Sequence, residues 1–273
     1  MSGRFEGLTD LQWGFLSSFF PPPPQKRGKG SPPADRRKVL NSILYILITG
    51  SRWCDLPKGE QWGARSTSHR WLERWMEEGT FERIKQGLLS VAHLNGLIDW
   101  ESSSVDGSFS PGKGGGKDVD YGYKGKGVTI HSLVDRKGAP LAVSVTSAKG
   151  SEREQVLPLL NSITIQTGEV GRPKSNPKNI AADKGYDSKE LRKNLRQKGI
   201  RPEIPKRIWK NRKQPKGRKL QKRVERYVVE RTFSWYQRKF RRLVVRWERK
   251  SNLFEAFVDL GFVMIWLDKI LLG

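Results

Sequence analysis

Apolar residues near the start of the chain recur at the spacing of one helix face. A Thr9–Gln12 capping box marks the beginning of this helix, because each side chain can accept a hydrogen bond from the other residue's backbone N–H. Four prolines at 21–24 mark its end, since proline cannot continue a helix. The stripe between these signals predicts an amphipathic helix and comprises Leu8, Leu11, Phe15, Leu16 and Phe19.

Three further helices are expected in the first third of the chain. Asp35 is placed to cap the second helix, which ends at Gly50. Ser66 is the expected cap of the third, and Thr80 opens the fourth. The pattern therefore predicts an all-helical unit over residues 1–98.

The pattern then changes to that of strands. Segment 103–110 is short and bounded by turn residues, and segments 126–135 and 141–148 follow it. The sequence RKGAP between the last two is a hairpin signal. These segments predict three consecutive antiparallel strands.

The rest of the chain alternates helices with two more strands. One helix is expected behind a Ser151–Glu154 capping box, and another behind Asp187 with Glu190. Strands are expected within 177–186 and 200–205, and further helices at 223–240 and 253–272. A three-strand meander followed by such alternation is the ribonuclease H-like order. Residues 99–273 are therefore expected to form an α/β domain on a mixed sheet.

The charge of the chain indicates a polyanionic partner. Its 52 Lys and Arg residues against 28 Asp and Glu residues give a formal charge of +24. Nucleic acid is the obvious polyanion for such a surface. An anionic membrane is the alternative, but the long apolar stretch at 253–272 contains charged residues, which argues against a bilayer span. With no apolar signal core at its start, the chain is expected in the cytoplasm.

The residue types also restrict the metal chemistry. Cys54 is the single cysteine and the chain has three histidines, so a zinc cluster of Cys and His is excluded. A metal would be held mainly by carboxylate oxygens, which points to a hard cation such as magnesium.

Two aspartates stand where such a cation would be useful. Asp106 lies in the first strand and Asp183 ends the fourth, and these strands are neighbours in the expected topology. Two adjacent carboxylates repel unless a divalent cation lies between them. A third ligand would come from the later helix, where periodicity does not separate Glu225 from Glu230. The bland alternative is that each aspartate, followed closely by glycine, only forms a turn.

Six segments carry a resemblance to a known family: LTDLQWGFLSSFFPPP, DRRKVLNSILYILITGSRWCDLP, STSHRWLERWMEEGTFERI, VDGSFS, ADKGYDS and VERTFSWYQRKFRRLVVRWER. Spread over nearly the whole chain, they resemble the transposases of the bacterial insertion-sequence-five family, a DDE group. The resemblance implies a helical, helix-turn-helix-like DNA-binding domain at 1–98 and a ribonuclease H-like catalytic domain at 99–273.

The resemblance also implies the catalytic residues. It places the family's acids on Asp106, Asp183 and Glu230, and not on Glu225, as ligands of two Mg²⁺ ions for which Mn²⁺ would substitute. The Tyr-Arg-Glu-Lys signature of related groups is only partly present. Arg226 and Glu230 fit it, whereas Arg223 stands at the tyrosine position and Gln237 at the lysine position. Arg238 and Lys239 are the candidate substitutes for that lysine.

Basic and aromatic residues around the acids are the candidate DNA contacts. The segment STSHRWLERW is a recognition helix, part of a helical bundle, or both at once. The segment PGKGGGKD fails the pattern of a nucleotide-binding loop and is expected to be a mobile basic loop. Trp235 and Trp247 are either core residues or stacking platforms for an unpaired base. The candidate contacts are Arg65, Arg70, Arg74, Lys113, Lys117, Lys184, Lys206, Arg207, Lys210, Arg212, Lys213, Arg226, Arg231, Trp235, Arg238 and Lys239.

These observations lead to one expected function and two rivals. The expected protein is a transposase that binds double-stranded DNA at terminal inverted repeats, hydrolyses the ends and joins them to target DNA. The rivals are a ribonuclease H-like nuclease or resolvase without strand transfer, and a domesticated DNA-binding protein. We expect a chain that is monomeric alone and pairs as a homodimer on DNA, in bacterial cytoplasm at the nucleoid. The segment 253–272 is expected to be core in preference to a dimer contact.

Overall fold

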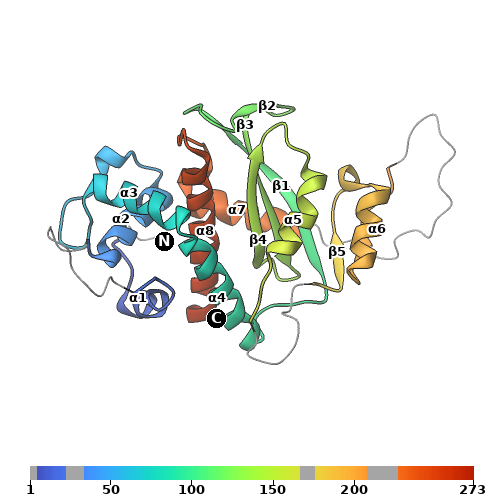
Figure 1. Cartoon of the computed structure of the whole chain (residues 1–273), viewed down its shortest axis with the longest axis horizontal. Coiled ribbons are helices and arrows are strands. Elements are labelled where there is room, and N and C mark those ends of the chain that lie inside the picture. Colours follow the sequence, from blue (N-terminus) through green and yellow to red (C-terminus); the bar gives the residue numbers. More distant parts are fainter. Residues whose placement is uncertain (1–4, 23–33, 167–175, 208–226) are drawn as a thin grey trace.

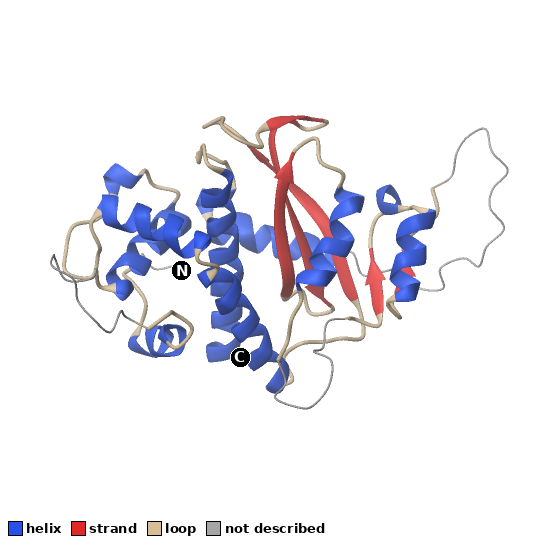
Figure 2. Ribbon diagram, viewed as in Figure 1, coloured by secondary structure: helices blue, strands red, loops and turns tan. Residues whose placement is uncertain are grey.

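The computed structural model describes residues 5–22, 34–166, 176–207 and 227–273. Helices gather at one end of the molecule and a mixed sheet lies at the other, with a long helix between them (Figures 1 and 2). The chain is therefore a mixed α/β protein, as expected.

The four helices predicted in the first third are confirmed: α1 (Asp10–Ser17), α2 (Arg36–Thr49), α3 (Arg65–Glu77) and α4 (Thr80–Leu94). Helix α1 begins with the expected Thr9–Gln12 capping box, and α2 begins with the expected Asp35 cap. As expected, α2 ends at Gly50, whose backbone is in the left-handed conformation. The expected Ser66 cap is wrong, because α3 already begins at Arg65 and its N-cap, Ala64, has no side-chain hydrogen bond. A short 3₁₀ turn, η1 (Trp53–Asp55), connects α2 to α3.

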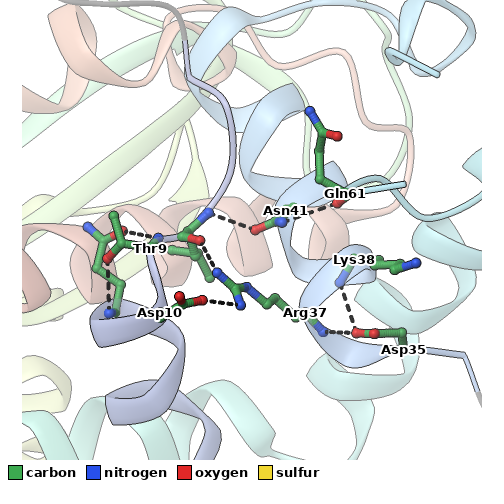
Figure 3. A network of polar contacts seen from close by, with 9 residues as sticks. Thr9, Asp10, Asp35, Arg37, Lys38, Asn41 and Gln61 are labelled. Atoms are coloured by element: carbon green, nitrogen blue, oxygen red, sulfur yellow. Dashed lines mark hydrogen bonds and ion pairs between the residues drawn. The ribbon is translucent and has the colours of Figure 1, made fainter. Parts of the chain in front are cut away.

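A polar network joins α1 to α2 (Figure 3). The Asn41 side chain is buried; it accepts a hydrogen bond from Leu8 N at 2.9 Å and donates one to the Gln61 carbonyl at 3.1 Å. Arg37 of α2 pairs with Asp10 of α1 at 2.6 Å. A buried amide with both ends bonded fixes the geometry of these segments, since each unmade bond would be costly.

The sheet contains the three predicted antiparallel strands and two shorter parallel ones. The long strands are β1 (Ser103–Pro111), β3 (Gly125–Asp135) and β4 (Pro140–Ser147). The predicted later strands are β5 (Asn179–Ala181), parallel to β1, and β6 (Arg201–Glu203), parallel to β5. The order is β4-β3-β1-β5-β6. A short strand that the sequence did not predict, β2 (Asp120–Gly122), forms a hairpin with the start of β3.

The remaining helices are α5 (Val156–Ser162), α6 (Lys189–Gln197), α7 (Tyr227–Lys239) and α8 (Ser251–Leu272), with 3₁₀ turns η2 (Glu152–Gln155), η3 (Lys184–Tyr186) and η4 (Arg241–Leu243). Two expected caps are wrong. Ser151 makes no side-chain cap bond, and the helix there starts as the 3₁₀ turn η2. Ser188 caps α6 because Asp187 is held by Arg192 at 2.8 Å.

Helix α8 is buried along most of its length and joins the helices to the sheet. It packs against α2, α3 and α4 on one side and β4 on the other (Figure 1). The prediction that 253–272 is core is confirmed, since nearly every residue from Leu253 to Leu267 is buried. Helices α1, α2, α3 and α4 thus share a continuous core with α8. The division into domains at 98/99 stays a prediction. Within the described ranges, no helix has the length and hydropathy needed to cross a bilayer.

Candidate active site

Asp106 lies in the middle of β1, at an opening in the sheet. β1 pairs with β5 only through Ser103 and Ser104, so on that side the rest of β1 runs beyond the end of its neighbour. The Asp106 carboxylate accepts a hydrogen bond from Gly107 N at 2.9 Å. Because β1 continues to Pro111, Asp106 and Gly107 do not form a turn. The turn interpretation of this Asp-Gly pair is wrong.

Asp183 comes two residues after β5, at the same opening. Ser104 pairs with Ala181, the last residue of β5, so the ladder ends two residues before Asp106 on one strand and two residues before Asp183 on the other. Asp183 is also the N-cap of η3, where its carboxylate accepts a hydrogen bond from Gly185 N. The predicted neighbourhood of the two strands is confirmed.

A third carboxylate, which the sequence analysis did not identify as a site residue, lies beside this pair. Glu152 of η2 accepts a hydrogen bond from the Tyr186 hydroxyl at 3.2 Å, and Tyr186 is 2% exposed. Its carboxyl carbon lies 3.0 Å from the position that a Cβ on Gly107 would occupy. Glu152 therefore touches both acid-bearing segments. The sequence predicted a capping box of Ser151 and Glu154, which lie on either side of Glu152. That pattern gives no indication of a contact between Glu152 and Tyr186.

The electrostatics of the opening reflect this crowding of acids. Burial raises the pKa of Glu152, and the charges of Asp106 and Asp183 raise it further. The hydrogen bond from Tyr186 and, to a smaller extent, the charge of Lys124 in the β2–β3 turn oppose this rise in the pKa of Glu152. Burial, followed by the charge of Glu152, raises the pKa of Tyr186 as well, so its hydroxyl stays a proton donor. The opening thus concentrates negative charge in a cationic protein.

Glu230 is exposed on α7, on the flank that faces β1. Gln237, two turns later on the same flank, donates to the Ser108 hydroxyl at 3.1 Å. On another flank, Thr232 donates to the Gly138 carbonyl in the β3–β4 turn, near the start of β1. Glu230 precedes Gln237 in α7 by about 10 Å along the helix axis. Asp106 precedes Ser108 in β1 by about 7 Å along the strand. Glu230 and Gln237 therefore share the flank of α7 that contacts β1.

The donor types at the opening suit a hard cation, since they are carboxylate oxygens. Across the described ranges, however, no three His, Cys, Asp or Glu side chains are grouped closely enough to hold a metal ion. The assignment of Asp106, Asp183 and Glu230 as a complete set of metal ligands stays a prediction.

Most of the expected DNA contacts are exposed. The exposed ones are Arg65, Arg70, Arg74, Lys113, Lys117, Lys184, Lys206, Arg207, Arg231, Arg238 and Lys239. Four others, Lys210, Arg212, Lys213 and Arg226, lie outside the described residues. So does the rest of the segment 208–223, which is rich in Lys and Arg. Exposure permits a role in DNA binding, which stays a prediction for every residue of the set.

Several of these cations already have partners within the chain. Arg74 pairs with Glu78 at 2.7 Å, and Lys239 pairs with Asp268. The Arg231 guanidinium lies 5.2 Å from the centre of the half-buried Trp235 ring, and the Lys269 ammonium lies 5.5 Å from it. A base that stacked on Trp235 would have to compete with these cations.

The glycine-rich segment 111–118 is anchored, and the expectation of a mobile loop is wrong. The buried Arg246 donates to the Lys117 carbonyl at 2.6 Å, and Gly114 N donates to the Arg246 carbonyl at 3.2 Å. A Cβ on Gly114 would lie 2.0 Å from the Trp247 carbonyl oxygen, so glycine is required for this approach. The loop presents Lys113 and Lys117 from a fixed backbone.

Two family models match the chain. Residues 96–266 match the transposase DDE domain, and residues 8–85 match the putative transposase of the IS4/5 family. The first match covers more than half of the chain and contains the whole opening around Asp106 and Asp183.

Two relatives at 31–40% identity are described as transposases of insertion sequence elements. The putative transposase of insertion element IS402 from Burkholderia cepacia is 40% identical over 135 residues, which is 50% of this chain and 60% of that protein. The IS1106 transposase of Neisseria meningitidis serogroup B is 31% identical over 150 residues, or 52% of this chain and 47% of that protein. The chain thus matches only about half of these relatives' lengths. A piggyBac transposase synaptic complex with hairpin DNA aligns with a TM-score of 0.45 and 10% identity, covering 95% of this chain and 70% of that chain.

Proposed function

Because the chain belongs to the DDE transposases of the IS4/IS5 family, we propose that it moves a bacterial insertion sequence. In this proposal it binds the terminal inverted repeats of the element and hydrolyses a phosphodiester at each end. It then uses each freed 3′ hydroxyl to attack target DNA. The alternative of a domesticated DNA-binding protein is disfavoured by the acids at the opening.

The observation that carries the proposal is the parallel pairing of β1 with β5, which makes the strand that contains Asp106 a neighbour of the strand that precedes Asp183. Glu230 is the proposed third acid, supported by its place on the flank of α7 that faces β1. The strand order β4-β3-β1-β5-β6 supports assigning the sheet to the ribonuclease H-like class.

The acids would hold the metal and the surrounding cations would hold the DNA. Asp106, Asp183 and Glu230 are the proposed ligands of Mg²⁺, which when bound supplies charge neutralisation and activation of the attacking oxygen in phosphoryl transfer. The exposed Lys184 follows Asp183 directly and is placed to contact a backbone phosphate. The anchored loop with Lys113 and Lys117 would fix a second stretch of backbone.

Two chains are proposed to pair on DNA, since both element ends must be cut and joined together. The burial of α8 leaves its apolar residues unavailable for a large dimer contact. Neutralisation by DNA would instead remove the repulsion between two chains that each carry +24. Light scattering with and without terminal DNA tests this, and a stable dimer without DNA at moderate salt would contradict it.

The proposed activity is tested with labelled DNA that contains the ends of the chain's own element. Incubation with Mg²⁺ and an unlabelled target plasmid should give cut ends and joined products. Cutting without joining would indicate a nuclease or resolvase instead. Binding without cutting would indicate a DNA-binding protein that has lost its chemistry.

A further inference from the structure

The two aspartates are brought together by a very short stretch of sheet. The β1–β5 ladder pairs two residues of each strand and ends at Ala181, before either aspartate is reached. Beyond that point, Asp183 belongs to the η3 turn. The ladder alone therefore does not fix the separation of Asp106 from Asp183.

Glu152 and Tyr186 provide a further contact between the two segments. Tyr186 is the last residue of η3 and is 2% exposed, so its hydroxyl needs a hydrogen-bond partner inside the protein. The Glu152 carboxylate is that partner, at 3.2 Å. The same carboxyl group lies against Gly107, the residue after Asp106, where a Cβ would approach its carbon to 3.0 Å. One side chain thus joins η3 to β1.

This contact lies on the opposite face of β1 from Asp106. Neighbouring residues of a strand point to opposite faces. Ser108, on the Asp106 face, is bonded to Gln237 of α7, whereas Gly107 faces Glu152 of η2. Glu152 therefore lies on the face of β1 opposite to the face that carries Asp106 and contacts α7.

We propose that Glu152 and Tyr186 are positioning residues, which hold Asp183 on η3 at a fixed distance from Asp106 on β1. The inference rests on the proposed function, because the distance matters only if the two aspartates act together. It also explains two features of the sequence. The tyrosine of ADKGYDS supplies the hydroxyl, and the glycine of VDG leaves room for the carboxyl group.

The test compares Glu152→Ala, Glu152→Gln and Tyr186→Phe in the full chain. Glutamine keeps an oxygen that can accept the tyrosine hydrogen bond, whereas alanine removes the contact and phenylalanine removes only the hydroxyl. Glu154→Ala is the matched control, since Glu154 is an exposed acid of the same η2 turn. Two quantities are measured for each variant: the kcat for cleavage of terminal DNA and the affinity for Mn²⁺ in the absence of DNA.

We expect Glu152→Ala and Tyr186→Phe each to lower kcat and Mn²⁺ affinity by about 10- to 100-fold, the range for residues that orient metal ligands. Glu152→Gln and Glu154→Ala should stay close to wild type. The double variant Glu152→Ala with Tyr186→Phe should be no worse than either single change, because both remove one contact.

The opposite outcomes are equally distinct. A loss with Glu152→Gln as complete as that with Asp106→Asn would make Glu152 a metal ligand and overturn the positioning role. Wild-type kinetics and Mn²⁺ affinity for Glu152→Ala, or for Tyr186→Phe, would also overturn it. If the wild-type chain cuts no DNA, the proposed function fails, while the Mn²⁺ affinities still report on the Glu152–Tyr186 contact.

Discussion

Buried carboxylates in the helical half of the molecule are neutralised by cations of the chain itself. Asp259 of α8 pairs with Lys85 of α4 at 2.7 Å, and Glu248 pairs with Arg242 at 2.6 Å. At the β1–β5 opening the arrangement differs. There Glu152 is bonded to a neutral tyrosine hydroxyl, and its pKa is raised by burial and by Asp106 and Asp183.

The difference separates acids that are paired with a cation of the chain from Glu152, which is bonded to a neutral hydroxyl close to two other acids. A chain with 52 Lys and Arg residues has enough cations to pair with every buried acid. Gathering like charges at the opening costs free energy, which a divalent cation supplied from outside would recover. The crowding of Asp106 and Asp183 around Glu152 is the feature that the buried ion pairs lack.

The largest expected effect comes from removing an acid at the opening. Asp106→Asn keeps the size of the side chain but removes the charge, and it should lower the DNA cleavage rate by at least about 10³-fold, equivalent to about 4 kcal/mol. Glu230→Gln should have a similar effect. Binding to terminal DNA, measured by gel shift, should change little in either variant. Retained cleavage in Glu230→Gln would remove Glu230 from the site.

A structural acid should give the reverse result. Lys85→Met leaves Asp259 buried without its cation, so the free energy of unfolding should fall by about 3–5 kcal/mol in urea titrations. The double variant Lys85→Met with Asp259→Leu should recover most of this loss, because an apolar pair needs no neutralisation. If the double variant is as unstable as the single one, this pair is not the electrostatic unit described above.

A buried histidine that stays neutral in the folded chain makes the free energy of unfolding depend on pH. His131, paired across the sheet with Gly107, is 0% exposed, and its burial lowers its pKa from 6.5 to about 4. Between these pH values the histidine is mostly protonated in the unfolded chain and mostly neutral in the folded chain. Stability from this group is therefore complete above pH 6.5 and falls by about 3 kcal/mol on acidification to pH 4.

His131→Gln isolates this contribution from that of the acids. Its unfolding free energy should lose the part of the pH slope between pH 6.5 and 4 that the histidine causes. The two chains should show the same slope above pH 7. Identical slopes over the whole range would mean that His131 titrates in the folded chain as it does in water.

The smallest effect is expected at an exposed ion pair. Lys178 and Glu101 approach to 2.5 Å, but their side chains are 68% and 59% exposed. Lys178→Ala should change the free energy of unfolding by less than about 1 kcal/mol. A loss as large as that of Lys85→Met would show that burial does not decide the value of ion pairs in this chain.

The sequence predicted the elements better than their contacts. Helices α1 and α8 and the long strands β1, β3 and β4 followed from the pattern of apolar residues along the chain. The stripe predicted for α1 was wrong at Leu11, which is 66% exposed. The predicted N-caps at Ser66 and Ser151 were wrong, because neither side chain makes the N-cap hydrogen bond to its helix. The three-residue β2 is too short for a periodic signal.

For the candidate site, the sequence predicted that the strands of Asp106 and Asp183 are neighbours, because this follows from strand topology. It missed Glu152, whose contacts with Tyr186 and Gly107 depend on how η2 folds back against the sheet. It also treated 111–118 as mobile, since the buried Arg246 that anchors this segment is more than a hundred residues away in the chain. Long-range polar contacts carry no local pattern.

The most direct test of the central claim is the binding of Mn²⁺, followed by electron paramagnetic resonance of the free ion. Wild-type protein and Glu101→Gln, which removes an exposed acid from a structural pair, should bind Mn²⁺ equally. The double variant Asp106→Asn with Asp183→Asn should lose at least about tenfold in affinity, since the carboxylate charges at the opening are the proposed ligands. Equal binding by the double variant and the wild type would contradict the account, because the acids at the opening would then not be the site of the cation.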